Sequence, residues 1–232
     1  MDQFKFCRLA LSTGLMLLVL TFPAHPDQLP MVPSPNGFIE ASTLSAFIRN
    51  MAVAGQPASS KLIGAYYPPD ALAEILSAGQ TNPAAFCKAN VLKEFGSVQA
   101  ADDYLKQLVR NAKKEGGQRF DRNDAAVDRI LKHYENAAKN VRDGVTITVN
   151  GSTVLGALAE TDSYYASSAI FSYTSSDGQR TAIMPFAVAV VWMRIGKQVV
   201  TLLVAYPFLG KASILAANDT LLNWLESVIT AN

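Results

Sequence analysis

Four side chains close together in the sequence could bind a ligand or act on it. They are Glu160, Asp162, Tyr164 and Tyr165, in the run "ALAETDSYY". Paired carboxylates perform acid–base chemistry on glycosidic bonds, and neighbouring aromatic rings offer a stacking surface. We expect this run to lie where a strand ends and predict a small groove there for a sugar or a peptide. The competing interpretation is a polar strand end with tyrosines at its edge.

Thiol chemistry has one candidate nucleophile beyond the N-terminal region. After residue 25 the chain contains one cysteine, Cys87, and one histidine, His133. A lone cysteine in an apolar run is usually a small buried group, and His133 stands among charged residues typical of a solvated helix face. A pairing of the two for catalysis remains open. One residue of each kind is too few for a zinc site.

Other cofactor motifs do not fit the chain. The acidic run "DRNDAAVD" has Ala125 and Ala126 at the positions where a calcium loop needs an oxygen ligand and a glycine. No glycine-rich nucleotide motif and no G-x-S-x-G elbow occurs in the sequence. We therefore predict no cofactor and no metal.

The charge balance argues against a nucleic-acid partner. The chain has 20 basic and 19 acidic residues, and the remainder is neutral once Asp2, Lys5 and Arg8 are set aside. Binding to phosphate backbones requires clustered Lys and Arg, and no such stripe occurs.

The N-terminus has the order of a secretory signal. Lys5 and Arg8 precede the uncharged stretch Leu9–Phe22, and a proline-containing exit follows. The stretch is shorter than the roughly 20 apolar residues of a spanning helix. We predict a signal peptide over 1–24 and a proline-rich linker over 25–37. Because Phe22 suits the cleavage site poorly, retention as an uncleaved anchor is the alternative.

The first half of the body alternates between helical and strand patterns. Helices are predicted over 42–55, 70–79, 98–116 and 123–143, and strands over 61–68 and 84–95. After residue 144 the apolar period changes to two. Asn150-Gly151 predicts a tight hairpin there, because both residues tolerate positive φ. A further strand is expected over 163–173, with a turn at 176–178.

Two strongly apolar segments, Thr181–Met193 and Val199–Gly210, raise the question of a membrane. Each is too short for a span. Each is rich in Val and aromatic residues, and Arg194 and Lys197 flank a glycine between them. Strands apolar on both faces belong at the centre of a sheet covered on both sides. We therefore predict neighbouring central strands and no transmembrane body.

The last 21 residues of the sequence predict an amphipathic helix, with Asn218 and Asp219 on its solvated face. The fold class is therefore α+β: a central, mostly antiparallel sheet of about six or seven strands, covered by helices. No second linker occurs, so residues 38–232 are expected to form a single domain.

The region 182–232 resembles the closing segment of PsbP-like proteins, which include DcrB-like bacterial envelope proteins. It shares two adjacent apolar strands ending in "LLVAYPF", a serine-containing turn and a final helix with a tryptophan. The resemblance implies an antiparallel sheet between helical layers and a non-catalytic envelope or assembly protein. It implies no site residues.

From these features we expect an exported, periplasmic or secreted protein that binds a small ligand or an envelope protein without catalysing a reaction. The alternative is a secreted hydrolase that uses the Glu160/Asp162 region or the Cys87 thiol. Glu160, Asp162, Tyr164 and Tyr165 are the candidate ligand-binding residues in either case.

Overall fold

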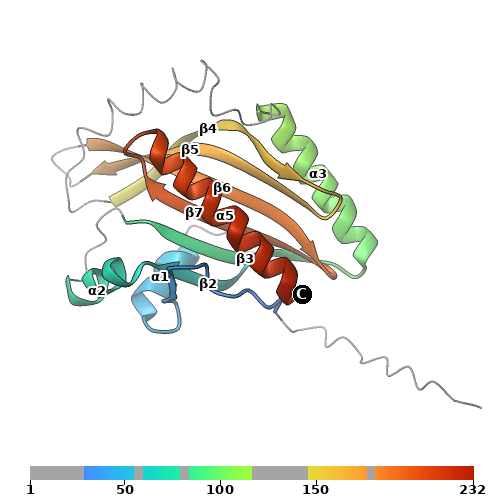
Figure 1. Ribbon diagram of the computed structural model, residues 1–232, viewed down its shortest axis with the longest axis horizontal. Coiled ribbons are helices and arrows are strands. Elements are labelled where there is room, and N and C mark those ends of the chain that lie inside the picture. The colour runs from blue at the N-terminus through green and yellow to red at the C-terminus, as the bar shows by residue number, and fades with distance from the viewer. Residues whose placement is uncertain (1–28, 55–59, 79–83, 117–145, 177–180) are drawn as a thin grey trace, which may run out of the picture.

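The computed structural model describes residues 29–54, 60–78, 84–116, 146–176 and 181–232 (Figure 1). The expected signal peptide, the helix expected over 123–143, His133 and the tip of the turn at 176–178 lie outside these residues.

Seven strands form one antiparallel sheet, in the order β1-β2-β3-β7-β6-β5-β4. The strands are β1 (Ile39–Glu40), β2 (Lys61–Tyr67), β3 (Phe86–Glu94), β4 (Thr146–Glu160), β5 (Tyr164–Ser176), β6 (Thr181–Ile195) and β7 (Gln198–Pro207). The described helices are α1 (Ala46–Ala54), α2 (Pro69–Ala78), α3 (Val98–Gly116) and α5 (Lys211–Ala231). The predicted α+β class and antiparallel sheet are confirmed.

The two apolar segments are the adjacent strands β6 and β7, as predicted. Gly196 has φ 56° in the turn that joins them, a left-handed conformation that favours glycine. Side chains are buried on both sides of these strands, because alternate residues point to opposite faces and helices lie on both sides of the sheet. No described helix is long and apolar enough to cross a membrane.

The predicted hairpin at Asn150-Gly151 is wrong. Strand β4 continues through these residues and pairs with β5 along its length, with a register shift between Val149 and Gly151. The reversal occurs at residues 161–163, where the Thr161 amide donates to the Tyr164 carbonyl over 2.9 Å. The Asn-Gly pair tolerates a β-bulge as well as a turn, and pairing with the long strand β5 favours the bulge.

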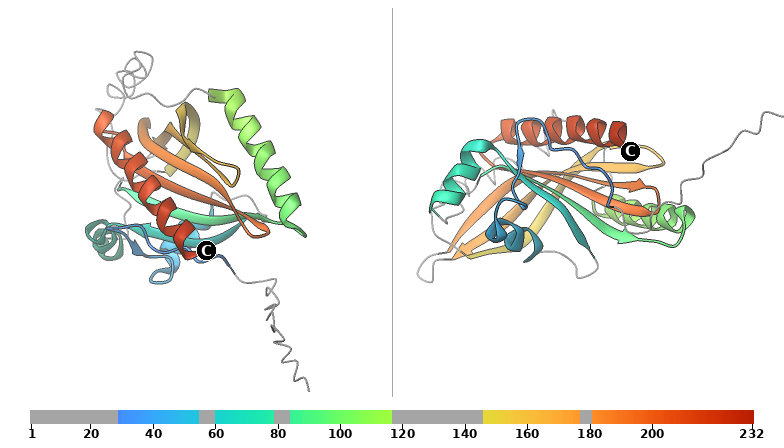
Figure 2. Two further views of the ribbon diagram at one scale, coloured as in Figure 1. Left: turned by 45° about the vertical axis from the view of Figure 1, so that its right-hand side comes forward. Right: turned by 90° about the horizontal axis from the view of Figure 1, so that it is seen from below.

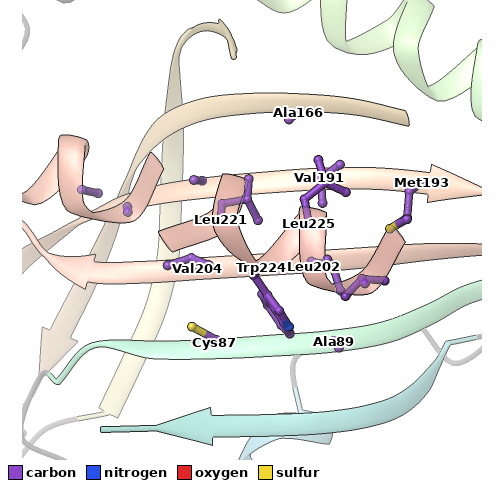
Figure 3. Packing of buried hydrophobic residues seen from close by; sticks show 14 of the residues in the cluster. Cys87, Ala89, Ala166, Val191, Met193, Leu202, Val204, Leu221, Trp224 and Leu225 are labelled. Carbon is purple, nitrogen blue, oxygen red and sulfur yellow. The ribbon is translucent and has the colours of Figure 1, made fainter. Parts of the chain in front are cut away.

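Helix α5 lies across one face of the sheet, which we call the first face (Figure 1). Its buried residues are Ile214, Ala217, Asn218, Leu221, Trp224, Leu225 and Val228. In Figure 3 the Trp224 ring extends from α5 toward β3, near Cys87 and Ala89. The expectation that Asn218 faces water is wrong: Asn218 is 4% exposed, because it lies on the same side of the helix as Leu221 and Leu225.

The chain before β1 forms a strap, residues 31–33, over the C-terminal half of α5. The Trp224 indole N–H donates to the Pro33 carbonyl over 2.7 Å, and the Tyr66 hydroxyl donates to the Val32 carbonyl over 3.3 Å. The Asn232 side chain donates to the Met31 carbonyl and accepts from its amide. The described part of the predicted linker thus has no helix or strand but is attached to the folded body.

The opposite, second face is covered by the other described helices, α1, α2 and α3. Ile48 of α1 and Leu72 of α2 pack with Ala65 of β2. At the other end, α3 packs its buried residues Ala101 and Leu105 against the sheet. Figure 2 shows α5 on one side of the sheet and α1 and α3 on the other.

Candidate functional site

A cleft of about 420 Å³ opens between α3 and the turn of residues 161–163. Its lining residues are Leu105, Lys106, Val109, Arg110 and Lys113 from α3, and Glu160, Thr161 and Asp162 from the end of β4 and the turn. One wall is therefore a helix and the other a strand end, and they come from distant parts of the chain.

The helical wall begins with a cap. The Ser97 hydroxyl accepts a hydrogen bond from the Ala100 amide over 3.1 Å, which satisfies one of the free N–H groups of the first turn. The apolar side of the helix places Ala101 and Leu105 against Trp192 and Val199 of the sheet. This packing leaves the polar side facing outward and toward the 161–163 turn.

An ion pair attaches the N-terminal half of α3 to the sheet. Asp102 contacts the guanidinium of Arg194 near the end of β6, and both side chains are about three-quarters buried. The Arg194 amide also donates to the Ser163 carbonyl over 2.8 Å. The same residue therefore connects the helix to the turn that forms the other wall.

A second ion pair joins the two walls of the cleft. The Lys113 ammonium lies 2.6 Å from Glu160 Oε1, and the two side chains are 44% and 43% exposed. Such exposure screens the attraction, so this contact orients the two walls more than it stabilises the fold.

Three other charged side chains lining the cleft have no ion-pair partner among the described residues. Lys106 and Arg110 lie on the helical wall, and Asp162 lies on the turn. Arg110 donates from Nε to the Lys106 carbonyl over 3.3 Å, which leaves its terminal nitrogens available. On the same helical wall, Leu105 and Val109 provide an apolar lining.

Three of the four predicted site residues come together here. Glu160 and Asp162 line the cleft, and Tyr165 pairs with Glu160 across the β4–β5 ladder. The Lys113 ammonium lies 6.0 Å from the centre of the Tyr165 ring, which stacks on Trp192.

The Tyr165 side chain is fully buried beside the cleft. Burial raises its pKa, and the Glu160 charge raises it further while Lys113 opposes the shift. Its hydroxyl has no hydrogen-bond partner among the described residues. Because a buried hydroxyl without a partner is costly, a polar group or water beside it is favoured.

Tyr164 does not belong to this site. It is next to Tyr165 in a strand, so its side chain points to the first face, where it packs against the α5 core. The structure therefore divides the tyrosine pair between the two sides of the sheet.

Sequence reasoning missed the basic side chains of the helical wall. Lys106, Arg110 and Lys113 follow one another at helical spacing, which places them on one side of α3. That spacing is a detectable signal, but it also fits a solvated helix face. The basic side of α3 becomes one wall of a cleft only because the 161–163 turn lies opposite it.

Cys87 lies on the first face, in the core beneath α5. It is fully buried, and burial raises the pKa of its thiol well above the usual range. A thiol that stays protonated is a poor nucleophile. Among the described residues there is also no group of three His, Cys, Asp or Glu side chains that could hold a metal ion.

Fold and cleft together define the class: an antiparallel α+β protein with a charged cleft between one helix and one strand turn. Comparisons with protein-family models, with curated proteins and with solved structures found no match for this chain.

Proposed function

We propose that this chain is an exported, non-catalytic binding protein of the bacterial envelope, and that the cleft beside α3 binds its small ligand. The observation that carries the proposal is the presence of Lys106, Arg110 and Asp162 in one cleft without ion-pair partners among the described residues. Pockets of roughly 300–1,000 Å³ with a few convergent polar groups are typical of small-molecule sites.

Export is supported by the basic start, the apolar stretch Leu9–Phe22 and the proline-containing exit. The resemblance of residues 182–232 to PsbP-like envelope proteins points in the same direction.

A binding role is favoured over hydrolysis by the state of the candidate nucleophile and acid. Cys87 lies buried in the core with a raised pKa. Glu160 forms an exposed ion pair with Lys113, so its carboxylate already has a cationic partner in the cleft. The secreted hydrolase using Glu160 and Asp162 remains the competing function.

Cell fractionation tests export. The full chain, expressed in a Gram-negative host, is expected in the periplasmic fraction as a product about 24 residues shorter than the gene encodes. Mass spectrometry of the purified protein locates the new N-terminus. A full-length cytoplasmic product contradicts export, whereas a full-length product in the membrane fraction supports the uncleaved anchor.

Thermal-shift measurements with sugars, amino acids, short peptides and simple carboxylates test binding. A ligand of the cleft raises the melting temperature of the wild type but not of Arg110→Glu. Lys114→Glu, an exposed change on the same helix outside the cleft, keeps the response. Turnover of a bound compound that disappears in Glu160→Gln and Asp162→Asn supports the hydrolase instead.

Thiol labelling tests the cysteine version of the hydrolase. We expect Cys87 to resist a fluorescent maleimide in the folded protein and to react fully in denaturant, because its thiol is buried and protonated. Mass spectrometry measures the labelling. Rapid addition of one label to the folded protein would contradict a buried, protonated thiol.

A further inference from the structure

We infer that the cleft binds a short, apolar peptide as a zwitterion, with the peptide's carboxylate at Lys106 and Arg110 and its ammonium at Asp162. This inference rests on the proposed binding function and names the ligand class. It is carried by the distribution of charge. Among the described residues, Lys106 and Arg110 have no ion-pair partner and lie on the helical wall with the apolar Leu105 and Val109, whereas Asp162 has none and lies on the turn opposite.

The helical wall suits a carboxylate. Lys106 and Arg110 are four residues apart on α3, so their side chains project from the same side of the helix. A planar guanidinium matches a carboxylate with two parallel hydrogen bonds. The Arg110 terminal nitrogens are available for this, since only Nε is engaged within the helix.

The turn suits an ammonium group. Of the two carboxylates in the cleft, Glu160 is already paired with Lys113, so Asp162 is the one available. Its position is set by the turn around it, in which the Ser163 amide donates to the Thr161 hydroxyl over 3.2 Å. A cation bound at Asp162 therefore lies across the cleft from the helical wall.

The cleft also suits an apolar side chain. Leu105 and Val109 line it, and burial of apolar ligand surface against them is favourable. The volume of about 420 Å³ falls in the lower part of the range for small-ligand pockets and fits a di- or tripeptide.

Other ligand classes complement this arrangement less well. A polyanion such as a nucleotide would place negative charge beside Asp162, which is repulsive. A neutral sugar would desolvate the charged groups of both walls without pairing them. A zwitterion with an apolar centre pairs both ends at once.

Calorimetric titration of the purified mature protein with the tripeptide Ala-Leu-Ala tests the inference. The probe is used in four forms: free, N-acetylated, C-amidated and blocked at both ends. We expect the free peptide to bind and each singly blocked form to bind at least about tenfold more weakly, because each has lost one charge-assisted contact. The doubly blocked form is expected to show no measurable binding.

Two variants assign the ends of the peptide. In Arg110→Gln, C-amidation should weaken binding much less than in the wild type, because only Lys106 then pairs with the carboxylate. In Asp162→Asn, acetylation should no longer weaken binding. Lys114 and Asp219 are exposed and lie outside the cleft. In Lys114→Gln and Asp219→Asn, amidation and acetylation should each weaken binding as much as in the wild type. Circular dichroism and the melting temperature confirm that each variant is folded.

Two results overturn the inference and leave the proposed function standing. The first is equal binding of the free and acetylated peptides, with all binding lost in Arg110→Gln, which shows a site for simple carboxylates. The second is no binding of any peptide form while another compound of the wider panel binds in an Arg110-dependent way. If neither peptides nor panel compounds bind, both the inference and the proposed site are wrong.

Discussion

Helices α5 and α3 lie on opposite faces of the same sheet and are held there in different ways. Helix α5 buries seven of its 21 residues over the first face. Helix α3 has 19 residues, of which Ala101 and Leu105 are buried among those described, and two ion pairs attach it to the sheet. Helix α5 is therefore attached to the sheet mainly by apolar packing, and polar contacts contribute more to the attachment of α3.

This difference explains where a cleft can exist. Beneath α5 the side chains of the sheet and helix fill the space, and the strap over its C-terminal half adds hydrogen bonds from Trp224 and Asn232. Beside α3 a cleft of about 420 Å³ separates the helix from the 161–163 turn, which leaves room for a ligand. We therefore expect the first face to contribute most of the stability, whereas the candidate site lies on the second face.

The largest expected effect comes from removing the centre of the α5 interface. Trp224 is 1% exposed, packs edge-on against Tyr66 and holds the strap through its indole N–H. Trp224→Ala should lower the free energy of unfolding by about 3–5 kcal/mol, the usual cost for a large buried aromatic residue. Urea denaturation measures it. Asn223→Ala, an exposed neighbour, is the control and should change little.

The apolar contact of α3 with the sheet should contribute less to the free energy of unfolding than the α5 interface does. Leu105 is buried against Val199, but it also borders the cleft. Leu105→Ala is expected to cost about 2 kcal/mol, near the low end for such changes, because the site can partly collapse or admit water. The same denaturation experiment measures it. A loss as large as that of Trp224→Ala would contradict the proposed contrast between the helices.

The inner ion pair of α3 should have an intermediate effect. Asp102 and Arg194 are 24% and 26% exposed, so removal of one charge leaves the other partly buried. Asp102→Asn is expected to cost about 1–2 kcal/mol, between the values for exposed and buried pairs. Asp103→Asn provides the matched control, because Asp103 is exposed on the same turn. Equal effects of the two substitutions would contradict the role of the pair.

The outer ion pair should contribute least to stability. Lys113 and Glu160 are both more than two-fifths exposed. Lys113→Gln should therefore change the free energy of unfolding by less than about 0.5 kcal/mol, and raising the salt concentration should remove the difference. Thermal denaturation at low and high salt measures both. A larger, salt-independent loss would show that this contact stabilises the fold.

The sheet was largely predictable because strand periodicity is local. The buried alternation in β6 and β7 can be read from consecutive residues, and it identified both strands and their central position. The prediction of a hairpin at Asn150-Gly151 was wrong because a turn motif indicates only which backbone conformations the residues tolerate. Whether the chain reverses there depends on β5, whose 13 residues pair along β4 on both sides of the bulge.

The candidate site was only half predictable for a similar reason. Glu160 and Asp162 were identified by residue type, and both line the cleft. Tyr164 was expected beside them, but the structure places it on the opposite face from the cleft, since neighbouring side chains of a strand point to opposite faces. The helical wall could not be assigned, because Lys113 and Glu160 are 47 residues apart in the chain.

The sequence by itself determined the α+β composition, the two central strands and the amphipathic terminal helix, because each depends on the spacing of residues within one segment. The tertiary structure alone decided that Asn218 is buried and that β4 continues through Asn150. It also decided that the basic side of α3 faces Asp162 across a cleft. These features depend on which distant segments meet, and packing of the whole chain sets that.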